Sequence, residues 1–454
     1  MHRESVDDVF TLLIITTGLV RKSFKRLPTM SEWARFRKYA RRMRKFRVPG
    51  SQYSEVLSVL QFYAIDKPFF PNLEVLRWQS PTRELIPSIP LFLSPRTATV
   101  SIVFDGPNLP RAMIASMIAS FPALCPNLQE ISLRSLPRDP MITTALSGSF
   151  FASQRNTLRC LTVDSPLTEE ACKVIFNLPN LRELSVVIER DVPLPSVVLP
   201  NLANLTIDYD SNCDWLQGFR GATLENLASV TFNSQSESVG DFLEAFESVA
   251  LTTSTPATLS MFKFHTSRRW KPHYRSLLPF TQLKEITVDS PCLRGCSSTV
   301  DDGIINDIAR AMPRLEILHL ADPCQTPAGV TASGLAALAY HCLHLTSLRI
   351  HFQVASLQTP TVPGVPSNSV PTIPREDCAL THLNVGSTPL SKDSVVMVTL
   401  TLLRIFPRIK RITSPDYSSV GWRKADEAVS LSKQFIDRSS KRPSLHQQVV
   451  ESPI

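Results

Sequence analysis

The chain has 454 residues, of which 43% are hydrophobic and 19% are charged. This composition excludes wholesale disorder, because disordered chains hold fewer apolar residues. Glycine is scarce at 14 residues and proline abundant at 36, which argues against glycine-rich phosphate-binding loops. The length exceeds that of one ordinary globular core, so it suits either several domains or one repeat array.

The net charge of +8 is concentrated near the N-terminus. Residues 1–48 hold 13 Lys and Arg but only four acidic residues, so a partner that responds to charge should meet this region first. Within it, the apolar run 9–20 (VFTLLIITTGLV) is too short for a bilayer span, which needs about 20 residues. Acids rather than bases precede the run, unlike in a secretory signal. We therefore expect a buried segment and no membrane partner.

Nine cysteines are scattered without regular spacing, which indicates a reducing compartment, cytoplasmic or nuclear. Cys292 and Cys296 are the one close pair, and no second pair or nearby histidine completes a zinc site. The P-loop, dinucleotide-binding, zinc-protease and serine-hydrolase signatures are absent from the sequence. We therefore predict no enzyme, no catalytic residue, no metal and no cofactor. Histidines of neighbouring repeats are interpreted as polar surface residues: His319, His344, His351 and His382.

One phrase recurs along the chain, Pro-Asn-Leu-x-x-Leu-x-Leu or a close variant. It occurs four times with its Pro-Asn-Leu lead, at 71–78, 126–133, 179–186 and 200–207. Variants without that lead begin at residues 158, 227, 283, 315, 345, 380 and 409, and weaker copies lie at 43–48, 99–103 and 259–264. The irregular spacing of roughly 21 to 35 residues is typical of leucine-rich repeats.

The phrase predicts a strand, because its last two apolar residues are two positions apart and point to one face. Such a strand cannot bury this face alone, whereas stacked copies form a parallel sheet with a continuous core. Stretches with helical spacing and Ser, Thr or Asp caps lie between the phrases, at 168–178, 238–250, 301–312, 331–342 and 391–406. We therefore predict an α/β fold, an irregular leucine-rich-repeat solenoid of about thirteen repeats. It would be a horseshoe with a parallel concave sheet and outer helices.

The segment Ser31–Val48 (SEWARFRKYARRMRKFRV) leads into these repeats, which end at Ile405-Phe406-Pro407-Arg408-Ile409 with Trp422 beyond. This combination resembles the repeat region of fungal F-box/leucine-rich-repeat proteins. In that family a Trp-x-Arg-Phe-x-x-Tyr-Ala helix precedes the first strand, and here its places are held by Trp33, Arg35, Phe36, Tyr39 and Ala40. The resemblance implies a substrate receptor of a cullin ubiquitin ligase, in which the F-box binds the ligase adaptor and the repeats bind the target.

The domain organisation follows from these patterns. Residues 1–35 would be a basic N-terminal segment and possible F-box remnant, since too few residues precede Trp33 for a whole F-box. Residues 36–413 would form the solenoid, with a Pro-rich inserted loop at 354–374. Residues 414–454 would form a C-terminal cap helix and tail. A ligase adaptor could bind if an F-box is present upstream or if the N-terminal segment retains a usable F-box remnant.

The predicted binding surface is the concave face of the sheet, reached by the residue between the last two apolar positions and by its neighbours two positions away. A partner with basic groups suits its acidic, hydroxyl-rich middle, although a merely solvated face remains the alternative for many positions. The residues are Glu130, Ser132, Arg134, Thr162, Asp164, Glu183, Ser185, Asn204, Thr206, Asp208, Ser229, Thr231, Glu285, Thr287, Asp289, His319, Arg349 and His351.

A basic patch accompanies the helix before the first repeat. Its members are Arg35, Arg37, Lys38, Arg41, Arg42, Arg44, Lys45 and Arg47. The simplest interpretation is an end-cap helix whose apolar stripe packs on the first repeat while its charges face water. Clustered Lys and Arg could instead bind a nucleic-acid backbone, or an anionic protein or membrane surface. The first functional hypothesis is thus a protein-binding module of an F-box-like receptor. The alternatives are a repeat scaffold without a ligase role, and nucleic-acid binding through the basic N-terminus.

Overall fold

The computed structural model describes residues 29–49, 57, 68–106, 109–188, 197–209, 219, 222, 224–234, 246, 258–266, 274–289, 300–320, 329–358, 378–415 and 420–440. Predictions for residues 1–28, for the tail beyond 440 and for nearly all of 238–250 therefore lie outside the described residues. The chain divides into two compact units. The N-terminal unit comprises residues 1–233 and 248–255, and the C-terminal unit comprises 234–247 and 256–454.

The strands of the N-terminal unit are parallel and follow chain order within the sheet. They are β1 (Lys45–Pro49), β2 (Val75–Gln79), β3 (Thr99–Val103), β4 (Glu130–Arg134), β5 (Cys160–Leu167), β6 (Glu183–Ile188), β7 (Asn204–Tyr209) and β8 (Ser229–Ser234). Its α-helices are α2 (Met30–Ala40), α4 (Ile89–Phe92), α5 (Arg111–Leu124), α6 (Pro140–Ala145), α7 (Phe151–Ser153) and α8 (Glu169–Ile175). The unit also has a 3₁₀ turn, η2 (Ile86–Ser88), and a π-helical turn, η3 (Leu146–Phe150).

The C-terminal unit continues the same pattern with β9 (Met261–Thr266), β10 (Glu285–Asp289), β11 (Ile317–His319), β12 (Ser347–Arg349), β13 (His382–Asn384) and β14 (Arg411–Thr413). These strands are also parallel and in chain order. Its helices are α11 (Asp302–Ala311), α12 (Ala332–His341), α13 (Val354–Gln358), α14 (Val395–Ile405) and α15 (Val420–Ser440), with the turns η5 (Tyr274–Leu277) and η7 (Lys392–Ser394).

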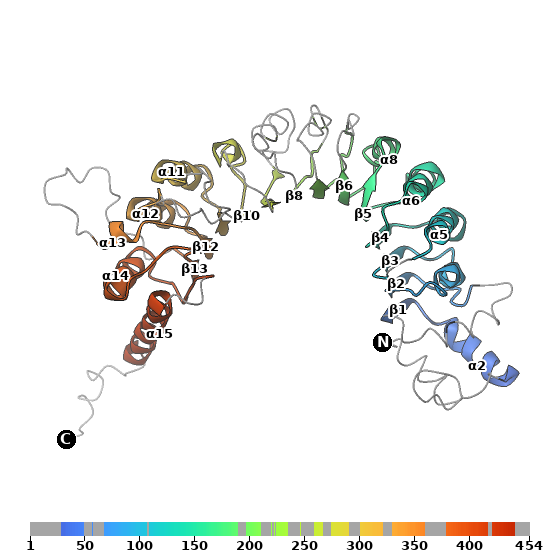
Figure 1. The fold of residues 1–454 in the computed structure, drawn as a ribbon, viewed down its shortest axis with the longest axis horizontal. Coiled ribbons are helices and arrows are strands. Elements are labelled where there is room, and N and C mark those ends of the chain that lie inside the picture. Colours follow the sequence, from blue (N-terminus) through green and yellow to red (C-terminus); the bar gives the residue numbers. More distant parts are fainter. Residues whose placement is uncertain are drawn as a thin grey trace, which may run out of the picture. The chain divides into compact units, whose positions relative to one another are not determined.

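Within each unit the helices lie on one side of the strands, as α5, α6 and α8 do beside β3–β5 and α11 and α12 beside β10–β12 (Figure 1). The fold is therefore the predicted α/β leucine-rich-repeat solenoid. We call the other side of each sheet its open face. No helix in the described part of the chain is both long enough and apolar enough to cross a bilayer.

The apolar residues of the repeated phrase form the core between sheet and helices. The apolar residues of this phrase in β2 and in β4–β14, from Leu73 to Ile412, are at most 3% exposed. In the phrase of β3, Thr97 takes the first apolar position and is fully buried. Its hydroxyl donates a hydrogen bond to the carbonyl of Leu73 at 3.1 Å, which satisfies this polar group inside the core.

Backbone carbonyls at the start of the strands join each repeat to the next. The carbonyl of Arg44 accepts the N–H groups of both Glu74 and Val75, at 2.8 and 3.0 Å. The carbonyls of Ala98 and Thr381 each bind two N–H groups of the following repeat in the same way. Neighbouring repeats therefore share hydrogen bonds as well as a core.

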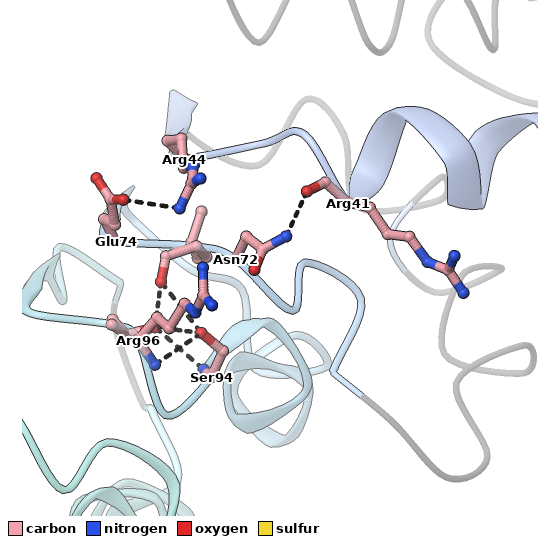
Figure 2. A network of polar contacts seen from close by, with 8 residues as sticks. Arg41, Arg44, Asn72, Glu74, Ser94 and Arg96 are labelled. Carbon is pink, nitrogen blue, oxygen red and sulfur yellow. Dashed lines mark hydrogen bonds and ion pairs between the residues drawn. The ribbon is translucent and has the colours of Figure 1, made fainter.

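The asparagine of the Pro-Asn-Leu lead adds a further link between repeats. Its side-chain amide donates to a backbone carbonyl of the preceding repeat, from Asn72 to Arg41 at 2.6 Å (Figure 2) and from Asn180 to Asn156 at 2.8 Å. Asn201 binds the carbonyl of Pro179 equivalently, and Asn226, which follows Glu225 instead of a proline, binds that of Pro200. Asparagine suits this place because its short amide can donate to a carbonyl while the preceding proline shapes the turn.

The helix predictions at 168–178, 301–312, 331–342 and 391–406 were confirmed with shifted bounds, and one loop prediction was wrong at its start. Thr168, Asp301 and Thr331 are N-caps, as predicted. The Pro-rich loop predicted from residue 354 begins later, because Val354–Gln358 forms α13. All five prolines of that stretch follow Gln358, so nothing in 354–358 prevents a helical turn. Residues 359–377 lie outside the described residues.

A helix covers each end of the array. At the N-terminal end, Thr29 and Glu32 form a capping box for α2, and Trp33 and Phe36 stack with ring centroids 4.9 Å apart beside Phe69 and Phe70. At the C-terminal end, the indole N–H of Trp422 in α15 donates to the carbonyl of Thr388 at 2.7 Å.

The carboxylate of Asp426 in α15 accepts the N–H of Ile412 in β14 at 2.7 Å. A side chain thus replaces the next strand at the end of this sheet, where an unpaired N–H would invite pairing with another chain.

We expect Asp426→Ala to lower the free energy of unfolding by about 1–3 kcal/mol, because the N–H of Ile412 loses its acceptor. Asp426→Asn keeps an oxygen acceptor and should lose less. Urea denaturation followed by circular dichroism measures the difference. Glu427→Ala, at the exposed neighbouring position, serves as control and should change stability by no more than about 0.5 kcal/mol. Equal effects of Asp426→Ala and Glu427→Ala would contradict the capping role.

Candidate functional site

The open face of the N-terminal unit carries a row of hydroxyl groups. Side chains alternate along each strand between the core and this face, and the strand register aligns the middle outward positions. The aligned residues are Ser101, Ser132, Thr162, Ser185 and Thr206, with Thr231 at the equivalent place of β8. All are half-buried.

Acidic residues line one edge of this hydroxyl row. Glu130 and Glu183 lie on either side of Cys160 in register. The hydroxyl of Thr99 donates to Glu130 at 3.2 Å, and the amide of Asn204 donates to Glu183 at 3.5 Å. Burial, followed by the carboxylates of Glu183 and Glu130, raises the pKa of the Cys160 thiol from 9.0 to about 11. Since the thiolate is the nucleophilic form, Cys160 is a weak nucleophile.

Other acids of this face are occupied by contacts at the carboxyl ends of the strands. Asp105 accepts the hydroxyls of Ser80 and Ser135, at 3.3 and 2.8 Å. Asp164 accepts the N–H of Ser135 and that of Leu136. These bonds fix the turn after β4, where Ser135 has a positive φ of 55°, a conformation uncommon for residues other than glycine.

The amide of Asn233 donates to Asp208 in a similar way. The carboxylates of Asp164 and Asp208 are therefore already used inside the unit.

The open face of the C-terminal unit is instead a network of ion pairs. Lys263 in β9 contacts Glu285 in β10 at 2.8 Å. Asp289 in β10 lies between two side chains, with His265 Nδ1 at 3.0 Å and Arg349 Nη1 at 2.8 Å. Charges of opposite sign on neighbouring strands stabilise a sheet modestly, so this network helps to hold β9–β12 in register.

Two histidines of this face form hydrogen bonds with serines. His319 Nε2 is 2.9 Å from the hydroxyl of Ser347, and His351 Nδ1 is 3.2 Å from that of Ser387. Burial, followed by the guanidinium of Arg349, lowers the pKa of His319 below 6.5, although nearby carboxylates act in the opposite direction. Within the described residues, no group of three His, Cys, Asp or Glu is placed to hold a metal ion.

The predicted binding residues all lie on the open faces or at their edges, and one of them is poorly accessible. Thr287 is 8% exposed, whereas the others are half-buried or exposed. The sequence analysis missed Ser101, Arg77, Lys263 and His265. Each occupies an outward position of its phrase, so the same rule applied to the weaker copies and to β2 identifies them. Whether a partner binds here stays a prediction.

The predicted basic patch is exposed throughout, but its members differ in their surroundings. Arg44 forms an ion pair with Glu74 at 2.9 Å, and Figure 2 shows the guanidinium of Arg41 pointing away from that network. Arg37 lies over the ring of Trp33 and Arg42 over that of Tyr39, with distances of 5.6 and 5.8 Å to the ring centroids. Lys45 and Arg47 point outward from β1 on the open face, because Phe46 and Val48 are buried.

No family model and no curated protein matches this chain. Among solved structures, a chain of the yeast Rad7–Elc1 complex is similar, with 16% identity over 72% of this chain and 91% of that chain, at a TM-score of 0.35. A chain of the Toll–Spätzle complex from Drosophila is similar with 11% identity over 77% of this chain and 50% of that chain, at a TM-score of 0.24. Neither likeness supports a statement about function.

The lowered pKa of His319 predicts a pH dependence of stability. In the unfolded chain the histidine binds its proton near pH 6.5, whereas the folded chain binds it only at lower pH. The contribution of His319 is therefore present above pH 6.5 and is lost as the pH falls through the folded-state pKa. His319→Gln should flatten the loss of unfolding free energy below pH 6.5 in urea titrations. An equal or steeper slope in the variant would contradict the buried, neutral histidine.

Proposed function

We propose that this chain is a protein-binding repeat array whose target lies on the open sheet face. We further propose that it is the target-recognition part of an F-box-like receptor of a cullin ubiquitin ligase. The observation that carries the first statement is the aligned row of half-buried hydroxyls on β3–β8, with acids beside it and no described helix of the unit on that side.

The hydroxyl row suits a protein segment because it offers many hydrogen-bonding groups over a long, narrow area. Neighbouring strands are about 4.8 Å apart, so the row from β3 to β8 extends for about 24 Å. An extended segment of about seven residues has that length. Serine and threonine hydroxyls both donate and accept, so they can bind either the backbone or polar side chains of the segment.

The ligase part of the proposal is supported by the resemblance of the N-terminal helix. In α2, Trp33, Phe36 and Ala40 are buried, and the chain passes from Ala40 into β1 within five residues. This is the arrangement that the resemblance to F-box/leucine-rich-repeat proteins implies. A repeat scaffold without a ligase role would share the same open face, so the two differ only in whether an adaptor binds.

We expect Ser185→Arg to abolish capture of the target, because a long cation fills the middle of the hydroxyl row and opposes a partner with basic groups. The tagged full chain is cross-linked in cells, and proteins enriched over an untagged control are quantified. Ser116→Arg is the matched control, since Ser116 is exposed on α5 on the helix side. A protein enriched with wild type and Ser116→Arg should fall at least about tenfold with Ser185→Arg. Equal enrichment with both variants contradicts binding at the open face.

The cross-linked samples of wild type, Ser185→Arg and Ser116→Arg also distinguish a ligase receptor from a repeat scaffold without a ligase role. A receptor should also capture a ligase adaptor with all three chains, because residue 185 lies far along the array from α2. Capture of the target without an adaptor in any sample would contradict the ligase role and leave a protein-binding scaffold.

A further inference from the structure

Three cations lie together on the open face at β1 and β2. Lys45 and Arg47 are two residues apart on β1, so both point outward, and Arg77 lies beside Arg47 in the parallel register. All three are exposed. The two strands are about 4.8 Å apart, which places the bases of the two arginine side chains side by side. We call Lys45, Arg47 and Arg77 the β1–β2 cation cluster.

No described acid neutralises this cluster. The outward positions of β1–β3 hold no acidic residue, and none of the three cations forms an ion pair with a described residue. Glu74, just before β2, is already paired with Arg44 (Figure 2). Like charges on directly neighbouring strand positions are destabilising. An anion bound between Arg47 and Arg77 would remove this cost.

The charged side chains on the open face of the C-terminal unit are arranged differently. On β9–β12, Lys263 pairs with Glu285, and Asp289 pairs with both His265 and Arg349. There the sheet supplies its own counter-charges. At β1–β2 the described residues supply none, so these cations are available to an anionic partner.

We propose that the β1–β2 cation cluster binds acidic side chains of a protein segment that lies along the open face of the N-terminal unit. The two guanidinium groups can each form paired hydrogen bonds to carboxylate or phosphate oxygens. The cluster deepens the proposed function and rests on it, because it assigns one end of the bound segment to β1–β2.

The rest of this face favours a protein over a nucleic acid. Beyond the hydroxyls of β3, it carries Glu130 on β4 and Glu183 on β6, which repel a phosphate backbone that continues along the sheet. Among the described outward positions of β1–β8, none is aromatic, so bases have no surface on which to stack. Three cations are also fewer than the six to ten phosphate contacts of a typical protein on duplex DNA.

The same charges define the pattern of the segment. Its acidic end lies over β1–β2, and basic groups lie over Glu130 and Glu183. The middle of β1–β2 and the middle of β4–β6 are about 3.5 strand spacings apart, or roughly 17 Å. An extended chain covers this distance in about five residues. A matching segment therefore has two acidic residues, about three neutral residues and then two basic residues.

The probe is a fluorescein-labelled peptide, Glu-Glu-Gly-Ser-Gly-Lys-Lys, and its binding to the purified full chain is measured by fluorescence anisotropy at low salt. A second peptide has the same composition with alternating charges, a third replaces both glutamates with phosphoserine, and an oligouridylate of eight nucleotides completes the set. The test variant is Arg47→Gln with Arg77→Gln. The control variant is Arg138→Gln with Arg155→Gln, which removes the same net charge at exposed positions outside the strands.

We expect the first peptide, whose like charges are grouped, to bind more tightly than the peptide with alternating charges. The test variant should bind this first peptide roughly three- to tenfold more weakly than the control variant does. A larger loss with the phosphoserine peptide identifies phosphate as the preferred anion, and an equal loss identifies carboxylate.

Equal affinities of test and control variants overturn the proposal. It is also overturned if the oligouridylate binds most tightly and is the probe that loses affinity with the test variant. These outcomes test the β1–β2 cation cluster alone. The proposed function is tested separately, and it is contradicted if Ser185→Arg captures the target as well as wild type does.

Discussion

Each strand of this protein depends on its neighbours to bury its apolar side. One strand offers two or three inward residues, which cannot form a core by themselves. The stacked phrases solve this, because their leucines and related residues are almost completely buried from Leu73 to Ile412. The carbonyl that binds two N–H groups of the next repeat adds a backbone link at the same level. Stability therefore comes mainly from the inward side, and ion pairs on the outward side of β9–β12 add a modest contribution.

The difference between the inward, core-forming side of the strands and their outward side explains how much could be predicted from sequence. The spacing of the apolar residues predicted the strands, and Ser, Thr and Asp caps predicted several helices, because both signals are local. Helix α5 was missed although Ile114, Ile118 and Phe121 have helical spacing. Pairings such as Lys263 with Glu285 depend on strand register, which composition does not reveal. The burial of Thr97 in a leucine position depends on one carbonyl from the previous repeat.

The candidate binding surface was predicted less completely than the fold. Outward positions follow from alternation, so most face residues were identified. Their availability does not follow, because Asp164 and Asp208 are used by neighbouring turns and strands. The two units also use their open faces differently. Charges on β9–β12 pair with each other, whereas β1–β2 carry cations and β3–β8 carry hydroxyls and acids. The second pattern leaves binding groups available to a partner.

The most direct test of this division compares two adjacent residues of β6. Leu184 points into the core and is 2% exposed, whereas Ser185 points to the open face and is half-buried. The free energy of unfolding is measured by urea denaturation for Leu184→Ala and Ser185→Ala. We expect the first to lose about 2–5 kcal/mol and the second to stay within about 0.5 kcal/mol of wild type. Equal losses would mean that both sides of the sheet stabilise the fold, and would contradict an open face reserved for binding.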